Sequence, residues 1–369
     1  MTAGVTAPRF TAFDRLRGLI MALMAIDHAS YAIARIHAFE AWSTAVPEPV
    51  TITRAISHLC APGFFMLMGA GMVWLGKARQ KSEGWSHARI RRFFITRGLV
   101  LLVVQHFIEN PAWILMTVSA DPSSPMLQAV EPGGGSDYFL HFAVISALGA
   151  AMIFWAFLIE LPSLVILAIT AAAAALSVWM TPPASEIATL WPYWKTLLFV
   201  PSHHNAINVL YPWVPWLVPA GLGIVLGRII YKRPEKTVTV ALGLGLVLIA
   251  THFAFAHSGV PGLSAFLKYP PTPSFLAVTL GVDLLLISVF AFAPSAMLGP
   301  LDVFGRSPLF FYLLHLYVLA AISFAFPSGS SLPVMYAVWA AAMVLIYPAC
   351  VRFARFKASK PVESMWRLF

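Results

Sequence analysis

The chain has 369 residues, of which 59% are hydrophobic and only 11% are charged. A soluble protein of this length carries about 25% charged residues, so the composition excludes an ordinary soluble domain and indicates a polytopic membrane protein. The net charge of +9 does not indicate nucleic-acid binding, because the basic residues follow a topological pattern. The two cysteines, Cys60 and Cys350, lie in apolar runs, and we expect neither a disulfide nor a metal cluster.

Ten apolar runs are long enough to cross a bilayer. They cover residues 14–36, 53–76, 93–117, 138–159, 162–180, 210–230, 237–256, 273–293, 308–326 and 333–352. We therefore predict an all-α, polytopic integral membrane protein with about ten transmembrane helices in one bundle, forming a single domain over residues 1–369. The tails 1–12 and 354–369 are expected to be short and cytoplasmic. The first run lacks a cleavage site of small residues, so we interpret it as an uncleaved span.

The basic residues support this order of spans. The chain has 24 Lys and Arg residues. If the N-terminus is cytoplasmic, the predicted outer segments hold four of them: Arg35, Arg54, Lys195 and Lys268. Cytoplasmic loops of membrane proteins carry an excess of basic residues. The pattern therefore predicts that both termini are cytoplasmic.

The first predicted span carries four ionisable residues: Asp14, Arg17, Asp27 and His28. Such residues cost at least a few kcal/mol inside a bilayer and usually mark a functional site. Asp14 and Arg17 lie one turn apart, and we expect them to form an ion pair at the inner interface. Asp27 and His28 are expected in the outer third of the membrane, on a helix face that points into the protein.

Other histidines are predicted at the same depth. His58 lies near the outer start of the second span, His106 lies on the third, and His141 is expected to begin the fourth. We predict that Asp27, His28 and His58 converge in one cavity. An Asp beside a His can fix its tautomer and raise its basicity, which suits a general base or a covalent acyl carrier. The alternative is a buried hydrogen-bonded network that holds the first two spans together.

Asp283 and His315 are expected nearer the membrane midplane or its inner half. The spacing of the chain's histidines does not match a HExxH-type zinc motif, so no metal is expected. These two residues are the second choice for a functional centre.

Several segments, taken together and in order, resemble a known family. They are DRLRGLIMALMAIDH (14–28), TRAISHLCAPGFFMLMGAG (53–71), YPWVPWLVPAGLGIVLG (211–227), LKYPPTPSFLAVTLG (267–281) and FGRSPLFFYLLHLYVL (304–319). They resemble the bacterial relatives of heparan-α-glucosaminide N-acetyltransferase, within the multispanning membrane acyltransferases. The resemblance extends from residue 12 to residue 353.

The resemblance implies ten or eleven helices, a homodimer in many members, and transfer of an acyl group from a cytosolic coenzyme A thioester to an acceptor on the far side. In the lysosomal enzyme the active centre includes an Asn, an Asp and a loop histidine. Laid on this sequence, the Asn position falls on Asp27, the Asp position on His58, and the loop histidine near His37. The implied location is the inner (plasma) membrane of a bacterial cell.

We therefore predict a membrane acyltransferase that moves an acetyl (acyl) group from cytosolic acetyl-CoA to an extracytoplasmic sugar or amino sugar. Asp27 would orient His28 or His37, and one of these histidines or His58 would act as the base or acyl carrier. The residues predicted to bind substrate or cofactor are Asp14, Arg17, Arg54, Arg89, Arg91, Arg92, Arg97, Asp283, Arg306 and His315.

Among these residues, Arg89, Arg91, Arg92 and Arg97 could hold the coenzyme A phosphates, or could act only as topology determinants. The expected partners are membrane lipids and a glycan acceptor, without nucleic acid. The rival hypothesis is a proton-coupled transporter or channel that uses the intramembrane Asp and His groups, although we find none of the inverted repeats common in transporters. A third hypothesis is a catalytically silent membrane partner.

Overall fold

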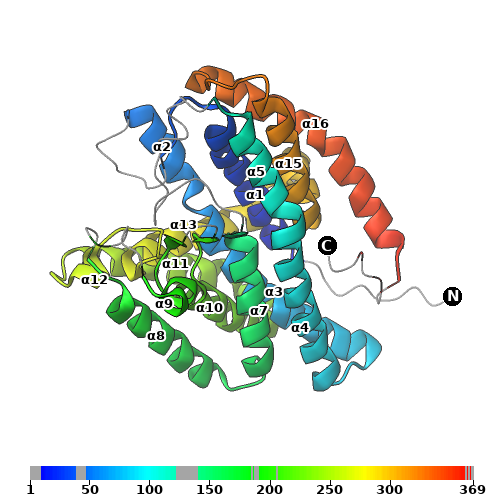
Figure 1. Cartoon of the computed structure of the whole chain (residues 1–369). Coiled ribbons are helices and arrows are strands. Elements are labelled where there is room, and N and C mark those ends of the chain that lie inside the picture. Colours follow the sequence, from blue (N-terminus) through cyan, green and yellow to red (C-terminus); the bar gives the residue numbers. More distant parts are fainter. Residues whose placement is uncertain are drawn as a thin grey trace.

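The computed structural model describes residues 10–38, 47–121, 140–183, 186, 191–204, 207–361, 364 and 366. All ten predicted apolar runs are helical in it (Figure 1). The α-helices are α1 (Thr11–Ile33), α2 (Glu48–Ser57), α3 (Cys60–Glu83), α4 (His87–Val104), α5 (Asn110–Ser119), α7 (Val144–Leu158), α8 (Ser163–Met180), α9 (Tyr193–Leu198), α10 (Trp213–Lys232), α11 (Thr237–Ala256), α12 (Pro261–Ser264), α13 (Pro273–Phe292), α14 (Ser295–Arg306), α15 (Pro308–Ser323) and α16 (Leu332–Ser359).

Within the described residues, eight helical segments are long and apolar enough to cross a membrane. They are α1, α2 with α3, α4 with α5, α8, α10, α11 with the short 3-10 turn before it, α13 and α16. The shorter α7 is also apolar, and α14 with α15 forms a further pair that bends by 97°. The prediction of an all-α polytopic membrane protein is confirmed. Eight of the described segments qualify as spans, or nine with the bent pair, against the ten predicted.

Helix α1 occupies the centre of one half of the bundle, where it packs against α3, α13, α14, α15 and α16. Its crossing with α14 is close. A Cβ atom on Gly18 would lie 2.0 Å from the carbonyl oxygen of Leu301, and one on Gly305 would lie 1.9 Å from that of Asp14. Small residues allow helix backbones to approach this closely within membranes. The crossing fixes α14 and the start of α15 against α1.

The structure corrects several predicted boundaries. The fourth helix starts at Val144, not near 138, and His141 lies in a strand. Strands β1 (Leu140–Phe142), β3 (Ile207–Val209) and β2 (Ser202–His204) form a small sheet in the order β1-β3-β2, with β1 parallel and β2 antiparallel to β3. The second span is divided into α2 and α3, with His58 between them. The last helix continues past residue 354 to Ser359.

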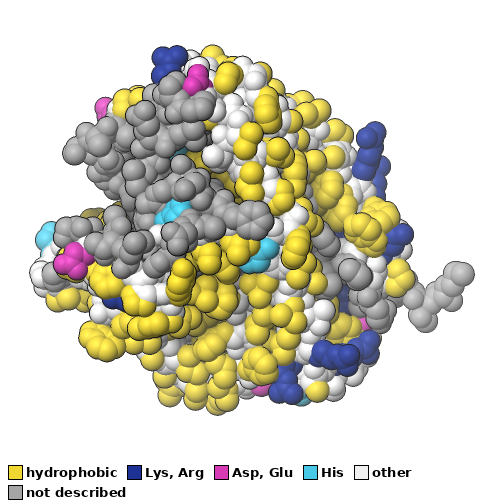
Figure 2. Space-filling model, viewed as in Figure 1, with side chains coloured by type: hydrophobic (Ala, Val, Ile, Leu, Met, Phe, Trp, Pro, Cys, Tyr) yellow, Lys and Arg dark blue, Asp and Glu magenta, His cyan; other side chains and the backbone are white. Residues whose placement is uncertain are grey.

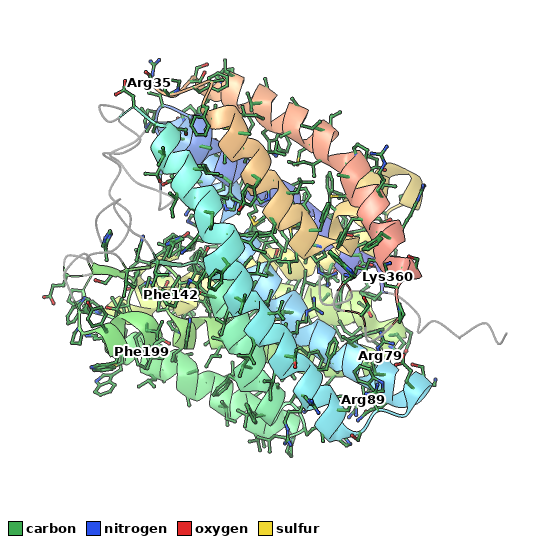
Figure 3. The ribbon with its side chains drawn as sticks, turned by 45° about the vertical axis from the view of Figure 1, so that its right-hand side comes forward. Arg35, Arg79, Arg89, Phe142, Phe199 and Lys360 are labelled. Carbon is green, nitrogen blue, oxygen red and sulfur yellow. The ribbon has the colours of Figure 1, made fainter. Side chains whose placement is uncertain are left out.

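Basic side chains gather where α3 ends, α4 begins and α16 ends, whereas hydrophobic side chains cover most of the visible helices (Figure 2). Arg79, Arg89 and Lys360 lie toward this basic end, and Arg35 lies at the opposite end (Figure 3). The predicted Asp14–Arg17 ion pair is confirmed, with 2.9 Å between the Arg17 Nη1 and Asp14 Oδ1 atoms. The basic end thus includes the start of α1.

Candidate active site

His28 of α1 and His315 of α15 form the centre of the site. The Nδ1 atom of His28 lies 2.8 Å from the Nε2 atom of His315, and the two rings stack with their centroids 5.0 Å apart. His315 Nδ1 also lies 3.0 Å from the carbonyl oxygen of Phe311. A carbonyl can only accept, so His315 Nδ1 carries the proton and, with both rings neutral, its Nε2 accepts from His28 Nδ1. This leaves the lone pair of His28 on Nε2.

Aromatic side chains position the His28 ring. Trp113 and Tyr312 meet it edge-on, at centroid distances of 5.0 and 6.0 Å. Both rings are bonded to the buried carboxylate of Glu109, which accepts from Trp113 Nε1 at 3.0 Å and from the Tyr312 hydroxyl at 2.6 Å. Glu109 ends a π-helical turn, Gln105–Glu109. Such turns occur often at functional sites, and this one carries Glu109 to the two rings beside His28.

Asp27 occupies a second polar cluster next to His28. Its Oδ1 atom is paired with Arg54 of α2 and accepts from the Ser57 hydroxyl at 3.2 Å. Arg54 also donates to the Tyr269 hydroxyl at 3.1 Å. A buried charge is tolerated when it is paired and hydrogen-bonded. The prediction that Asp27 orients His28 or His37 stays a prediction. The Asp27 carboxylate is bonded to Arg54 and Ser57, and the hydrogen-bond partner of His28 is His315.

A cavity of about 60 Å³, the narrow cavity, lies over these groups. Its charged and histidine lining residues are Asp27, His28, His37, Arg54 and His141. The other lining residues are aromatic or aliphatic: Tyr31, Trp113, Ala143, Val144, Leu210, Tyr211, Tyr269 and Tyr312. A smaller one of about 30 Å³ also touches Asp27 and His28. The polar side chains and aromatic walls make a small, enclosed space next to His28.

Burial keeps two further histidines at this cavity neutral. His37 lies past the end of α1, with its Nδ1 atom 3.1 Å from the Ser30 hydroxyl. Burial lowers the pKa of His37 to about 4, with Arg54 acting in the same direction and Asp27 opposing it. Burial likewise lowers the pKa of His141 to about 3. Both rings therefore stay neutral at neutral pH, and each has one nitrogen that can accept a hydrogen bond.

A wide cavity of about 420 Å³ extends from the basic end of the bundle toward His28. Its basic lining residues are Arg17, Arg79, Arg97, Arg306 and Lys357. The intervening walls are mostly apolar and rich in methionine, with Met21, Met68, Met72 and Met152. Val144 and Tyr312 line both this cavity and the narrow one. The two cavities are therefore adjacent, and share Tyr312, whose ring meets His28.

The structure separates some residues that the sequence placed together. His58 is buried with its ring 5.4 Å from that of Phe275, and it is not among the residues that line the narrow cavity. His315, expected in another layer of the membrane, contacts His28 directly. Asp283 is fully buried against α3, where a Cβ on Gly63 would lie 2.8 Å from its Oδ2 atom. It lines none of the cavities described above.

The predicted basic residues also divide into two groups. Arg97, Arg17 and Arg306 line the wide cavity. Arg91 and Arg92 are exposed, and Arg89 lies over the Trp85 ring at 4.4 Å.

The sequence analysis missed other site residues. They are Glu109 as a positioning group, Tyr312, Trp113, Tyr269, Arg79 and Lys357. One signal was available for Tyr312, because it stands three residues before His315 and so shares its helix face. The aromatic positions on other helices have no such signal.

Comparison with known families identifies the chain. The family model described as heparan-alpha-glucosaminide N-acetyltransferase, catalytic, matches residues 9–256. The chain belongs to this family. It is therefore a relative of a transmembrane acetyltransferase, and the prediction of an enzyme is confirmed. A search of curated proteins found no match.

The matched region contains α1 to α11, and with them His28, Asp27 and the Glu109 turn. His315 and Arg306 lie beyond it. Their place in the site comes from the fold of α14 and α15 against α1. Among the described residues, no group of three or more His, Cys, Asp or Glu side chains is arranged to hold a metal ion.

Proposed function

We propose that the protein transfers an acetyl group from acetyl-CoA to a sugar or amino sugar, and that the two sides of the membrane supply the two substrates. The observation that carries this proposal is the pair of adjacent cavities. One is wide and basic at its end, the other is small and polar, and Val144 and Tyr312 line both. This arrangement suits a large anionic donor and a small reacting group that meet at His28.

The donor's phosphates suit the basic end of the wide cavity, where Arg79, Arg97 and Arg306 can make charge-assisted hydrogen bonds. The apolar, methionine-rich walls suit the long pantetheine arm, since methionine fills irregular contact surfaces. The basic end is the predicted cytoplasmic side. We therefore place the donor on the cytoplasmic side and the acceptor on the other, in the plasma membrane.

His28 Nε2 supplies the base. The acceptor nitrogen or oxygen attacks the thioester carbonyl carbon, a C–N or C–O bond forms, and the C–S bond breaks. His28 Nε2 takes the proton from the acceptor and returns it to the departing thiolate. His315 holds His28 in the required tautomer, as its own Nδ1 donates to Phe311. The same Nε2 lone pair could instead attack the carbonyl first and carry the acetyl group.

The experiment that tests this proposal fills the wide cavity. A Cβ on Gly71 would meet no atom within 4 Å, and Gly71 lines the cavity. Gly71→Phe therefore starts from a Cβ position with open space and adds a ring at the lining of the proposed donor site. Gly243 of α11 also has open space around a Cβ but is not among the residues that line the wide cavity. Gly243→Phe is thus a matched control for the effect of replacing a helical glycine.

We expect purified wild-type protein to release thiol from acetyl-CoA when glucosamine is present. Gly71→Phe should weaken acetyl-CoA binding by at least about tenfold, which is about 1.4 kcal/mol, while Gly243→Phe should bind as the wild type does. Calorimetry and a thiol assay on the same samples measure both. Equal binding by the two variants would remove the wide cavity as the donor site. A wild-type protein that neither binds acetyl-CoA nor releases thiol would favour the transporter alternative.

A further inference from the structure

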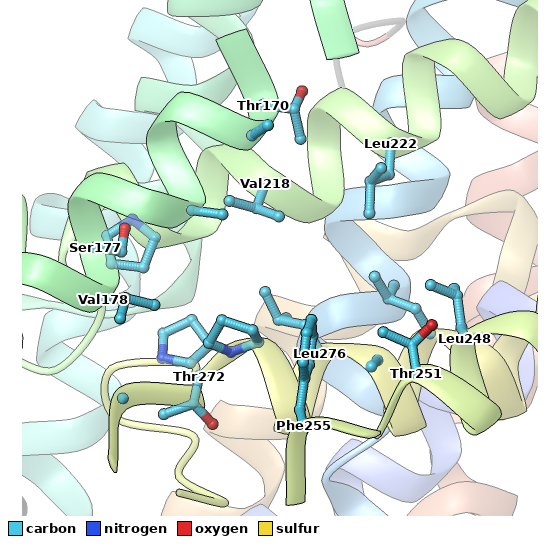
Figure 4. A pocket seen from close by; sticks show the side chains of 18 of the residues that line it. Thr170, Ser177, Val178, Val218, Leu222, Leu248, Thr251, Phe255, Thr272 and Leu276 are labelled. Carbon is cyan, nitrogen blue, oxygen red and sulfur yellow. The ribbon is translucent and has the colours of Figure 1, made fainter. Parts of the chain in front are cut away.

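A second large cavity shares no lining residue with the wide or the narrow cavity. This cavity, the side groove, has a volume of about 400 Å³ and is formed by α8, α10, α11, α12 and α13 (Figure 4). Val178, Val218, Leu222, Leu248, Phe255 and Leu276 are among the side chains that line it. Thr170, Ser177, Thr251 and Thr272 add hydroxyl groups. An apolar cavity of this kind does not hold ordered water.

The side groove lies between two packed helix pairs. Helix α8 packs against α10, and α11 packs against α13. The outward surfaces of α8 and α11 are apolar, with Leu164, Trp179 and Phe253 exposed. Both helices meet the length and hydropathy of membrane spans, so the medium outside the groove is lipid hydrocarbon. The chemistry that fits the groove is therefore a hydrocarbon chain.

The groove lies in the half of the membrane that contains the narrow cavity. The start of α8 is at the basic end, where Arg228 donates to the Ser163 hydroxyl at 3.1 Å. The groove is lined by later parts of α8 and α11, and by the first turns of α13. One short segment joins groove and site: Lys268 and Tyr269 line the cavities at Asp27, and the next residues, 271–273, line the groove.

We propose that the side groove binds the hydrocarbon chain of a lipid-anchored sugar, and that this lipid is the acyl acceptor. The inference rests on the proposed function and adds the class of the acceptor. A chain held in the groove would place its headgroup at the 268–273 segment, beside the narrow cavity. An unanchored sugar would make no use of a hydrocarbon site at this position. Because the chain passes from lipid hydrocarbon into the groove, its affinity depends on packing against the groove walls and not on removal from water.

The test compares two acceptors and two variants in full-length protein reconstituted in phosphatidylcholine vesicles. The acceptors are methyl glucosaminide and hexadecyl glucosaminide, which differ only in the alkyl chain. Ala174 of α8 lines the groove, whereas Ala175 next to it is exposed on the lipid side and does not line it. Ala174→Trp fills the groove, and Ala175→Trp is its matched control.

We expect Ala174→Trp to raise KM for the hexadecyl acceptor by about tenfold, about 1.4 kcal/mol, and to leave KM for the methyl acceptor unchanged. Ala175→Trp should change neither value. The inference would be overturned if both variants changed KM equally, or if Ala174→Trp changed KM equally for both acceptors. In either case, acetyl transfer by the wild type would still support the proposed function. Because each variant is compared with the wild type, partitioning of the long chain into vesicles does not affect the result.

A second measurement does not depend on activity. A hexadecyl glucosaminide with a diazirine in its chain should label peptides of α8 and α13, and Ala174→Trp should remove this label while Ala175→Trp retains it. Label spread evenly over the lipid-facing helices would overturn the inference. So would a diazirine phosphatidylcholine that labels the same peptides to the same extent, because the groove would then hold ordinary bilayer lipid. Labelling of the groove without any thiol release would retain the lipid site and contradict the proposed function.

Discussion

The wide and narrow cavities differ in size, charge and rigidity of their walls. The wide cavity, of about 420 Å³, has basic side chains and flexible methionines. The narrow one, of about 60 Å³, is lined by aromatic rings and by groups held in hydrogen bonds, such as Arg54 with Asp27 and Tyr269. Recognition of a large ligand tolerates adaptable walls, whereas catalysis needs groups held in fixed positions. Under the proposed function, the difference suits donor binding in the wide cavity and chemistry in the narrow one.

The largest expected effect comes from removing His28, the base in the proposed function. His28→Ala should lower kcat by about 10²–10⁴-fold, the usual contribution of general-base catalysis, and leave acetyl-CoA binding nearly unchanged. Steady-state rates and calorimetry on one preparation measure both.

The comparison variant is His58→Ala, because the sequence placed His58 in the same centre. Its ring packs against Phe275, so we expect a lower melting temperature and a smaller loss of kcat. A greater loss of kcat in His58→Ala than in His28→Ala would move the centre from the His28–His315 pair to His58.

A smaller effect, of the opposite kind, is expected in the wide cavity. Arg306→Ala should raise KM for acetyl-CoA by about tenfold or more and leave kcat nearly unchanged, since a hydrogen bond to a charged group contributes about 1.5–3 kcal/mol. The double variant Arg91→Ala with Arg92→Ala removes two exposed charges that do not line the cavity. It should change KM little. If the double variant has the stronger effect, the phosphates bind at the surface of α4 and not in the wide cavity.

The smallest effect concerns pH and His37. The folded pKa of His37 is about 4 and its ordinary value is 6.5, so between these values the unfolded chain binds more protons than the folded chain. The free energy of unfolding should therefore fall as pH decreases from about 6.5 to 4. The slope that His37 adds corresponds to at most about one bound proton per molecule. His37→Gln should flatten this slope in melting experiments on detergent-solubilised protein. An unchanged slope would show that other groups, such as His141, dominate the acid sensitivity.

Much of the fold follows from local sequence. Each of the ten apolar runs contains α-helix, because a chain in lipid must satisfy its backbone hydrogen bonds within each segment. The Asp14–Arg17 pair was also predictable, since residues three apart are neighbours on a helix. The small sheet was not, because β1 and β3 pair across a long sequence separation and each has only three residues.

The sequence by itself determined that this is a polytopic membrane protein, and it predicted Asp27 and His28 for the functional centre. Hydropathy, and the cost of ionisable groups in lipid, are properties of single segments. Only the tertiary structure decided the partners: His315 for His28, Arg54 for Asp27, and Glu109 behind the surrounding rings. The reason is that the crossing of α1 with α14 and α15 sets which faces meet, and a helix's own sequence specifies its polar face but not the side chain opposite.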